Sequence, residues 1–460
     1  MGYQLSIEQF KNSKMFDSKG KFSHKSGNRF KLFPFSARSA SAPVLELESV
    51  VGSFLCRINE KRPKPITVTE LVEKLKDDTE IQVGQEALFF ETIRQLFFTS
   101  NGTLRPVNIK MIEQIPCTEI SESKTAEYLV DVLGSLDAMR SSLAYAENCD
   151  SSNVLEAFVL SKLEFENRTV EKDGVRYFRV VNSLKNCFEE DFKYILEDSK
   201  RLREYLVPLL ELYFFSYTAQ TCMQLNRFMD GERETNIPLY FCLEWEKTSQ
   251  SRLCFKEGWK KLQSDIKKIF AHAITLEMLN QTNEGSEVVD YIRLKELASS
   301  EEKDCEISEQ IDALTVAYRN LITDCVEMNG LEKKFSPAGK TAASVKYLFE
   351  SIRIQFENVR SSPYNAYANK FESYCKKYLK NRGRSGLMLN LSEEEVIFIT
   401  KLCIKNQKQM RLKDVFKEFE KRGIFLDDIS KEQVTMYYEK LNLIEKKSDS
   451  GDAKYVKRIL

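Results

Sequence analysis

The sequence predicts a mainly α-helical protein with a multi-helical body, a small β element and a compact C-terminal module. Long segments repeat apolar residues at the three- to four-residue spacing of an amphipathic helix. Only short stretches alternate as a half-buried strand does. Residues 391–460 show three helix-start signals followed by a basic hairpin. At 460 residues and 42% apolar content, the chain can form several domains with a substantial core.

The first part, residues 1–43, is predicted to be a basic, extended N-terminal arm. Its segment 27–35 interleaves aromatic and cationic side chains. Such a segment either stacks on nucleotide bases or lies as an anchor strand against its own chain or a partner. We expect the anchor, because it is the commoner use of such a segment.

Residues 44–150 are predicted to form a helical domain. Pro63, Pro65 and Gly102 separate its helices, since these residue types interrupt helical patterns. The helices are expected over residues 44–59, 69–75, 85–98 and 126–147.

Residues 151–380 are predicted to form a larger helical body with a small β-hairpin. The hairpin is expected over residues 168–181, which alternate around a Lys-Asp-Gly turn. Residues 239–245 form a second short apolar run. Between these two segments, residues 188–229 predict a long helix with a kink at Pro208.

The last part, residues 387–460, is predicted to fold as a winged helix, after a basic, glycine-bearing link. Its first helix begins at Ser392, where Glu395 completes a capping box. A second helix covers residues 411–422 and ends at Gly423, which can adopt a left-handed conformation.

The third helix of this module is predicted to begin at Ser430, with Gln433 completing another capping box. Its inner face is expected to consist of Val434, Tyr437 and Leu441. Its outward face, which would enter a nucleic-acid groove, is expected to consist of Lys431, Thr435, Tyr438 and Asn442. The helix is neutral overall, unlike most helices that read bases.

The hairpin that follows would form the wing, and basic residues are concentrated on it. DNA contacts through this module are therefore expected to involve mainly phosphates. The predicted DNA-binding residues are Arg382, Arg384, Lys431, Tyr438, Lys446, Lys447, Lys454, Lys457 and Arg458. The alternative is a winged helix that docks on a protein and whose charges are merely solvated.

The charges are segregated, although the chain holds 69 basic and 69 acidic residues and has zero net charge. Both ends have an excess of cations, and the middle has an excess of anions. Positive ends favour contact with polyanions. They could equally bind the acidic body of a neighbouring subunit.

The cysteines and histidines predict neither a metal site nor a cofactor site. The closest of the eleven cysteines, Cys242 and Cys254, are twelve residues apart, so there is no C-x-x-C motif. The only histidines, His24 and His272, are far apart, which disfavours a zinc or catalytic site. Reduced thiols and the lack of a membrane-spanning apolar run indicate a cytoplasmic protein.

Two short motifs resemble catalytic sequences without meeting their requirements. The run Gly339-Lys340-Thr341 resembles the end of a phosphate-binding loop, but Lys334 stands where the loop needs its first glycine. It is expected to start a helix instead. Residues 244–247 resemble the carboxylate–lysine end of some metal nucleases, but Trp245 replaces the required acid.

Three segments resemble the DptG (also called DndG) family of bacterial DNA phosphorothioation-dependent restriction proteins. They are residues 362–368, 389–398 and 441–453. The resemblance is sharpest over about the last hundred residues. It implies a subunit of an anti-phage complex that restricts DNA lacking backbone sulfur.

The resemblance also implies two larger ATPase partners, DptF and DptH, which supply the motor and the cleavage chemistry. It implies no catalytic residue here, so the expected function is that of a non-enzymatic subunit that assembles with them and contacts DNA. The alternatives are a divergent metal-dependent nuclease subunit and a winged-helix transcriptional regulator. A nuclease would need acids clustered on strands, and a regulator would seldom need so large a body.

Overall fold

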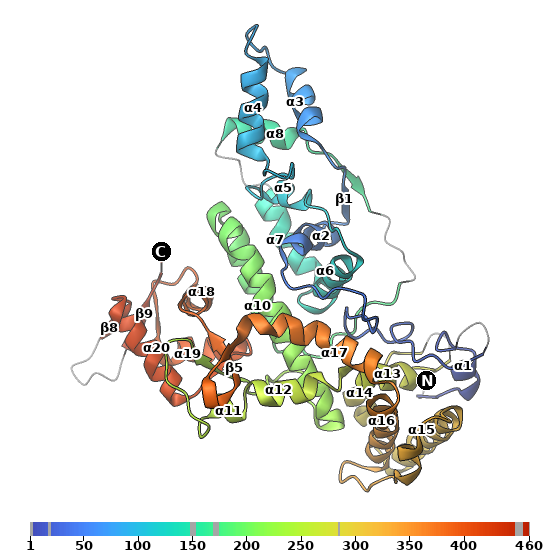
Figure 1. The fold of residues 1–460 in the computed structure, drawn as a ribbon. Helices are drawn as coiled ribbons and strands as arrows, with labels where there is room; N and C mark the ends of the chain where they lie inside the picture. Colours follow the sequence, from blue (N-terminus) through green and yellow to red (C-terminus); the bar gives the residue numbers. More distant parts are fainter. Residues whose placement is uncertain are drawn as a thin grey trace. The chain divides into compact units, whose positions relative to one another are not determined.

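The computed structural model describes residues 3–16, 20–147, 153–168, 174–283, 286–446 and 454–459, and the fold is mainly α-helical (Figure 1). The chain forms two compact units, whose limits differ from those of the four predicted parts. Unit 1 consists of Met1–Pro43, Val175–Leu184 and Phe215–Leu460, so the arm and the C-terminal module belong to the same unit. Unit 2 consists of Val44–Gly174 and Lys185–Phe214.

Unit 2 is a set of short helices with a two-stranded sheet. Its elements are α2 (Glu48–Ile58), β1 (Lys61–Pro63), α3 (Val68–Lys76), α4 (Glu86–Phe97), α5 (Ile109–Glu113), α6 (Ile120–Val132), α7 (Leu136–Glu147), α8 (Val154–Ser161), β2 (Phe165–Asn167), α9 (Lys185–Leu196) and the first part of α10 (Ser199–Asn226). Thr67 caps α3 in a full capping box with Glu70, which fixes where that helix begins.

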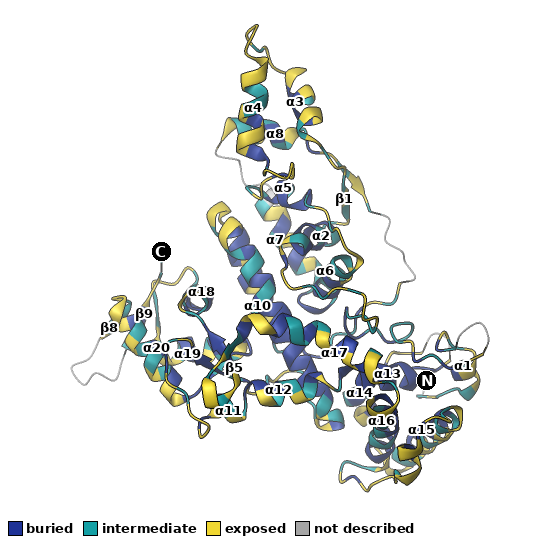
Figure 2. Ribbon diagram, in the orientation of Figure 1, coloured by how far each residue is buried: buried dark blue, intermediate teal, exposed yellow. Residues whose placement is uncertain are grey.

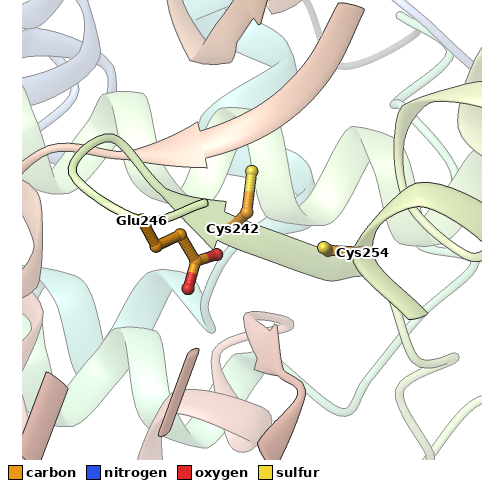
Figure 3. Close-up of side chains that lie close together, drawn as sticks. All are labelled: Cys242, Glu246 and Cys254. Carbon is orange, nitrogen blue, oxygen red and sulfur yellow. The ribbon is translucent and has the colours of Figure 1, made fainter. Parts of the chain in front are cut away.

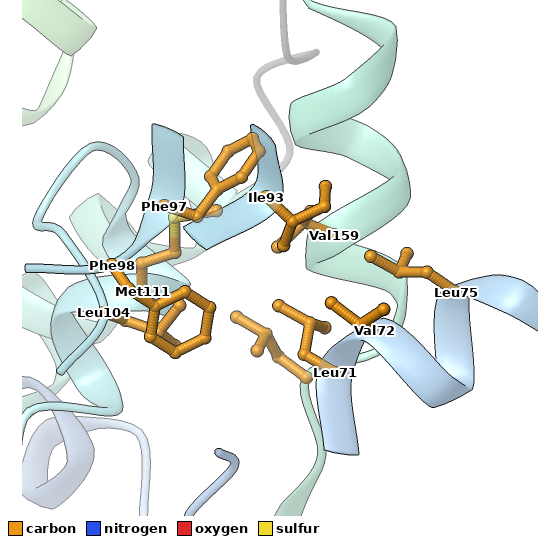
Figure 4. Close-up of a cluster of buried hydrophobic side chains, with 10 residues drawn as sticks. Leu71, Val72, Leu75, Ile93, Phe97, Phe98, Leu104, Met111 and Val159 are labelled. Carbon is orange, nitrogen blue, oxygen red and sulfur yellow. The ribbon is translucent and has the colours of Figure 1, made fainter. Parts of the chain in front are cut away.

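One hydrophobic cluster of unit 2 is formed by α3, α4 and α8 (Figure 4). Leu71 and Leu75 of α3 lie one turn apart and face Ile93 and Phe97 of α4. Val159 of α8 closes the cluster. These side chains are at most 5% exposed, so burial of their apolar surface stabilises the three helices together.

The prediction of a β-hairpin over residues 168–181 is wrong, because its two described flanks do not pair with each other. Residues 169–173, which include most of the predicted turn, lie outside the described part of the chain. On one side, Arg168 continues the antiparallel pairing of β2 with β1, because its amide donates to the carbonyl of Glu60 at 2.8 Å. On the other side, Tyr177 bridges to Lys31 of the N-terminal arm. Turn chemistry therefore suggested a local pairing, but each flank pairs with a more distant segment.

The predicted helix over residues 188–229 consists of two helices, α9 and α10. Pro208 lies inside α10, which continues through it to Asn226. Figure 2 shows α10 changing from exposed at its start to buried over its second half. None of the described helices is both long enough and apolar enough to span a bilayer.

Unit 1 contains the second half of α10 and the remaining elements. They are α1 (Ile7–Lys11), η1 (Phe228–Asp230), β3 (Tyr240–Leu243), α11 (Leu253–Lys256), α12 (Trp259–Ile266), α13 (Ile269–Leu279), α14 (Tyr291–Leu297), α15 (Glu301–Leu321), η2 (Val326–Gly330), α16 (Lys340–Asn358), α17 (Ser361–Cys375), η3 (Lys376–Tyr378), β4 (Leu379–Asn381), η4 (Gly383–Ser385), β5 (Leu387–Leu391), α18 (Glu393–Ile404), β6 (Gln409–Arg411), α19 (Leu412–Lys421), β7 (Phe425–Leu426), α20 (Asp428–Lys440), β8 (Ile444–Lys446) and β9 (Lys454–Lys457). Every residue of α13 is buried, which makes it the central helix of this unit.

The N-terminal arm packs against the rest of unit 1, as predicted for its aromatic segment 27–35. Phe30 is 1% exposed and packs on Phe178, with ring centroids 4.8 Å apart. Phe35 lies against Phe371 of α17. Because its rings are packed within the fold, this segment presents no stacking platform to nucleotides.

Two sheets organise the C-terminal half of unit 1. In the first, the strand order is β4-β5-β3-β7, with β3 parallel to both neighbours and β4 antiparallel to β5. The second is antiparallel and has the order β6-β9-β8. Since β3 lies between β5 and β7, the segment around residue 240 is part of the same layer as the C-terminal module.

Candidate functional site

The C-terminal module has the element order α18, β6, α19, β7, α20, β8 and β9. Its first helix, α18, begins at Ser392, and both hydrogen bonds of the predicted capping box with Glu395 are present. The second helix, α19, ends before Gly423, whose φ of 79° is left-handed as expected. The strands β6, β9 and β8 form one antiparallel sheet beside these helices.

The third helix, α20, begins one turn earlier than predicted. Asp427, not Ser430, is its N-cap, and the Asp427 side chain accepts a hydrogen bond from the Ser430 amide. Its buried residues are Ser430, Val434 and Tyr438.

The predicted outward position of Tyr438 is therefore wrong. Its side chain is 0% exposed, and its hydroxyl bonds to Thr400 of α18. Tyr437 is instead half-buried against Trp245, with ring centroids 5.1 Å apart. Leu441, which was expected on the inner face, is 41% exposed. In a helix, Tyr437 and Tyr438, three and four residues after Val434, are equally able to share its buried face. Tyr438 is the one that is buried, because its hydroxyl finds a hydrogen-bond partner in Thr400.

Lys431 lies at the start of the same helix and is already engaged. Its ammonium is 3.1 Å from Glu420 of α19 and lies over the ring of Phe416. A DNA phosphate would have to replace this ion pair. Of the two residues predicted to reach DNA from α20, one is thus buried and the other is paired within the fold.

The predicted hairpin residues have different surroundings. Lys446 is exposed, whereas Lys447 lies outside the described residues. Lys454 pairs with Glu439 of α20 at 3.1 Å. Lys457 and Arg458 are exposed; the Lys457 ammonium donates to the carbonyl of Asn442, and the Arg458 guanidinium donates to the side chain of Asn406.

Strand register identifies further cations that were not predicted. Arg411 lies opposite Tyr455, so the two share one face of the sheet with Lys457, two positions along β9. Lys408 is exposed just before β6, and its carbonyl accepts the Arg458 amide. We call Lys408, Arg411, Lys457 and Arg458 the sheet-face cations; Arg411 and Lys457 share one face, and Lys408 and Arg458 lie just beyond the strand ends. The brief polar alternation before Leu412 was the only sequence signal for this strand.

The predicted link residues separate into a structural arginine and a surface arginine. Arg382 is held inside the fold: its Nε donates to Asn390 at 3.0 Å and its Nη1 donates to the carbonyl of Glu244 at 3.1 Å. Arg384 is exposed. The link is not a free linker, because β4 and β5 pair across it as a hairpin.

A buried polar network joins the segment after β3 to the start of α20. Arg252 donates from Nε and Nη2 to the two carboxylate oxygens of Asp427, at 3.0 and 2.5 Å. Its Nη2 also donates to Ser430 at 2.7 Å and lies 3.1 Å from Glu246. Although burial opposes ionisation, the hydrogen bonds from Arg252 lower the pKa of Asp427. This charged pair therefore fixes the α20 start to the β3 segment.

Beside this network, Cys242, Glu246 and Cys254 form a buried cluster around the end of β3 (Figure 3). Their two sulfurs and a carboxylate oxygen all lie within 4.8 Å of one another. Gly258 is required for this packing, because a Cβ there would lie 2.2 Å from the Cys254 carbonyl oxygen and 2.8 Å from that of Tyr240. The spacing of these three residues in the sequence matches no known metal-binding motif. They come together only because a strand, a turn and a short helix fold against one another.

The two thiols of this cluster are electrostatically different. A hydrogen bond from Cys254, together with the nearby charge of Arg382, lowers the pKa of Cys242 against the opposing effect of burial. The same hydrogen bond, together with burial, raises the pKa of Cys254. Cys242 is therefore the first of the pair to ionise.

The two motifs that resemble catalytic sequences take structural roles. Gly339 precedes α16, with a φ of 110°, and the amides of Lys340 and Thr341 donate to Asp304 at 2.8 Å each. The carboxylate thus occupies the place that a phosphate would need. In the other motif, Glu244 is exposed beside Lys380 at 3.7 Å.

No protein family matches the chain, and no curated protein matches it.

Proposed function

We propose that this chain is a non-catalytic subunit of a bacterial DNA phosphorothioation-dependent restriction complex in the cytoplasm. It assembles with the ATPase subunits DptF and DptH, and its C-terminal module, a winged helix, contacts DNA. The resemblance of residues 389–398 and 441–453 to the DptG family supports the assignment. The order of helices and strands in the module fits a winged helix.

The sheet-face cations are the observation that supports DNA contact. Arg411 and Lys457 lie on strands, and Lys408 and Arg458 lie directly beside the strand ends, where a guanidinium or ammonium group can reach a phosphate without entering a groove. The third helix offers no free base-reading pair, because Tyr438 is buried and Lys431 is paired with Glu420. Contacts to the backbone position a protein without reading the sequence. The module therefore holds DNA of any sequence.

Exposed apolar side chains support assembly with larger partners. The segment from α15 to α16 exposes Val316 at 57%, Val326 at 76% and Phe335 at 91%. Large exposed apolar residues that gather on one segment are typical of protein-docking surfaces. A partner subunit would bury them.

DNA binding is tested with the full chain and a random-sequence duplex by fluorescence anisotropy. Lys457→Ala/Arg458→Ala should weaken binding several-fold and reduce the salt slope by about 0.9 for each lost contact. Lys417→Ala/Lys421→Ala on α19 removes the same charge from another face and should change binding little. Equal effects from both pairs would contradict a sheet-face site. Cleavage on addition of Mg²⁺ would instead indicate the nuclease alternative.

Assembly is tested by co-expression with the two ATPase subunits and co-purification through a tag on one of them. The wild-type chain should co-purify, and Val326→Ser/Phe335→Ser should reduce its recovery. Val83→Ser/Val154→Ser is a matched control, because these residues of unit 2 are 95% and 88% exposed. A wild-type chain that never associates with either ATPase would contradict the proposed complex.

A further inference from the structure

We propose that Cys242, Glu246 and Cys254 bind one divalent transition-metal ion, for which zinc has the fitting chemistry. The three ligand atoms lie within 4.8 Å of one another, a separation that small movements convert into a shared coordination sphere. All three residues are buried, at 0%, 6% and 0% exposure. They come from β3, the following turn and α11, so one short segment supplies the set (Figure 3).

The carboxylate of Glu246 provides an independent sign of a missing ligand. Its Oε1 accepts hydrogen bonds from the Leu243 amide and the Ser430 hydroxyl, both at 2.9 Å. Its Oε2 is buried and has no hydrogen-bond partner among the residues that the structure describes. Because a buried carboxylate oxygen without a partner is costly, a cation beside Oε2 would stabilise this arrangement.

The surrounding charges tolerate the ion. Glu246 and Asp427 supply two negative charges, and Arg252 and Arg382 supply two positive ones nearby. When a divalent ion binds two thiolates, it replaces the two thiol protons. The buried net charge therefore stays the same, and binding adds no unpaired charge to the interior.

The donor set favours zinc over the hard cations. Two sulfurs and one carboxylate suit a soft or borderline ion, whereas calcium and magnesium prefer oxygen ligands only. A tetrahedral ion has a fourth position for water or for Asn390, whose Oδ1 lies 3.1 Å from the Cys242 sulfur. Arg382, which bonds to Asn390 and lies 3.9 Å from that sulfur, orients the site from outside.

An ion could enter from a nearby open hollow. This hollow has a volume of about 370 Å³, and its lining includes Arg252, Leu253 and Asp427. Leu253 directly precedes Cys254 in α11. The bound ion would be structural, since it would tie β3 and α11 to the residues that hold the start of α20.

The test uses the purified full chain after chelation and reduction. Titration with cobalt(II), a spectroscopic stand-in for zinc, should produce thiolate-to-metal absorption that saturates at one ion per chain. Zinc should displace the cobalt and raise the melting temperature by several degrees, and elemental analysis should give one zinc. Cys242→Ser and Cys254→Ser should each abolish the absorption, and Glu246→Gln should weaken binding at least tenfold. Cys56→Ser, a buried cysteine of unit 2, should retain full binding.

Protection from alkylation tests the site in the wild-type chain, so the proposal does not depend on the folding of the variants. Zinc should slow the reaction of Cys242 and Cys254 with iodoacetamide at least tenfold and leave Cys117 unchanged. The proposal is overturned if the folded wild type gives no thiolate absorption with cobalt, or if the cysteine variants bind as well as the wild type. A Cys242–Cys254 disulfide that resists reduction in the native chain would also overturn it.

Discussion

The carboxylate of Glu277 in α13 accepts a hydrogen bond from the backbone amide of Phe30, 3.1 Å away. The amides of Gly27, Asn28 and Arg29 donate to the same carboxylate, at 3.0 to 3.2 Å. Glu277 is fully buried, and burial raises its pKa although the four amides act in the opposite direction. One acidic side chain of the central helix therefore holds a turn of the N-terminal arm.

Replacing Glu277 by Gln should release this turn. The amide side chain cannot accept four donors as a carboxylate does, so buried N–H groups lose partners. We expect a loss of about 2–4 kcal/mol in the free energy of unfolding. Urea unfolding measures this loss, and hydrogen exchange should accelerate at residues 27–30. Glu287→Gln, at an exposed glutamate, is the control. Unchanged exchange at residues 27–30 would contradict the anchoring role.

The pH dependence of stability should reveal His24. Burial, assisted by the charge of Arg360, lowers the pKa of this histidine from 6.5 to about 3. The folded state therefore binds fewer protons than the unfolded state between these two pH values. The contribution of neutral His24 is complete above pH 6.5 and is lost as the pH falls towards 3, by up to roughly 4 kcal/mol.

His24→Phe isolates this effect. The variant keeps a ring against Phe356 but loses the hydrogen bond to Tyr318, which spans 3.0 Å. At pH 7.5 the variant should be less stable by about 1 kcal/mol, and the difference should shrink and reverse as the pH falls to 4. Both chains have the same carboxylates, so urea midpoints compared at each pH report on His24 alone. A constant difference across this range would refute the prediction.

The Arg252–Asp427 pair should be strongly coupled. Removing either partner leaves the other charge buried, so Arg252→Ala and Asp427→Ala should each destabilise the fold by about 3–5 kcal/mol. The double variant should cost less than the sum of the two, because neither member of the pair is left without the other, although the buried Glu246 loses its contact with Arg252 in both chains that lack the arginine. Urea unfolding of the four chains measures the coupling energy. For comparison, the exposed pair Lys417 and Asp414 should show a coupling below about 1 kcal/mol.

Local signals in the sequence predicted the start of a helix correctly where only one residue nearby is a good N-cap. At Ser392 the capping box is the strongest start signal in its neighbourhood, and α18 begins there. At α20 both Asp427 and Ser430 are good caps. Asp427 is the actual cap, and its carboxylate also binds Arg252, 175 residues earlier. No local pattern includes a partner at that separation.

The candidate sites were less predictable, because they depend on pairing between distant strands. The sequence indicated a short strand near residue 240, but not that β3 pairs with both β5 and β7. This pairing brings Cys242 beside Asn390 and Glu246 beside Ser430. Similarly, Arg411 reaches the exposed face of the sheet only through its register with β9.

Tyr438 provides the sharpest test of the corrected orientation of α20. Because its hydroxyl bonds to Thr400 inside the module, Tyr438→Phe should reduce the free energy of unfolding by about 1 kcal/mol. It should leave DNA affinity unchanged, since the side chain is 0% exposed. Met436→Ala on the exposed side of α20, where the side chain is 53% exposed, should have little effect on stability. Urea unfolding and fluorescence anisotropy on the same preparations separate the two effects. If Tyr438→Phe instead weakened DNA binding at unchanged stability, the hydroxyl would have to face the nucleic acid, and the packing of α20 against α18 would be incorrect.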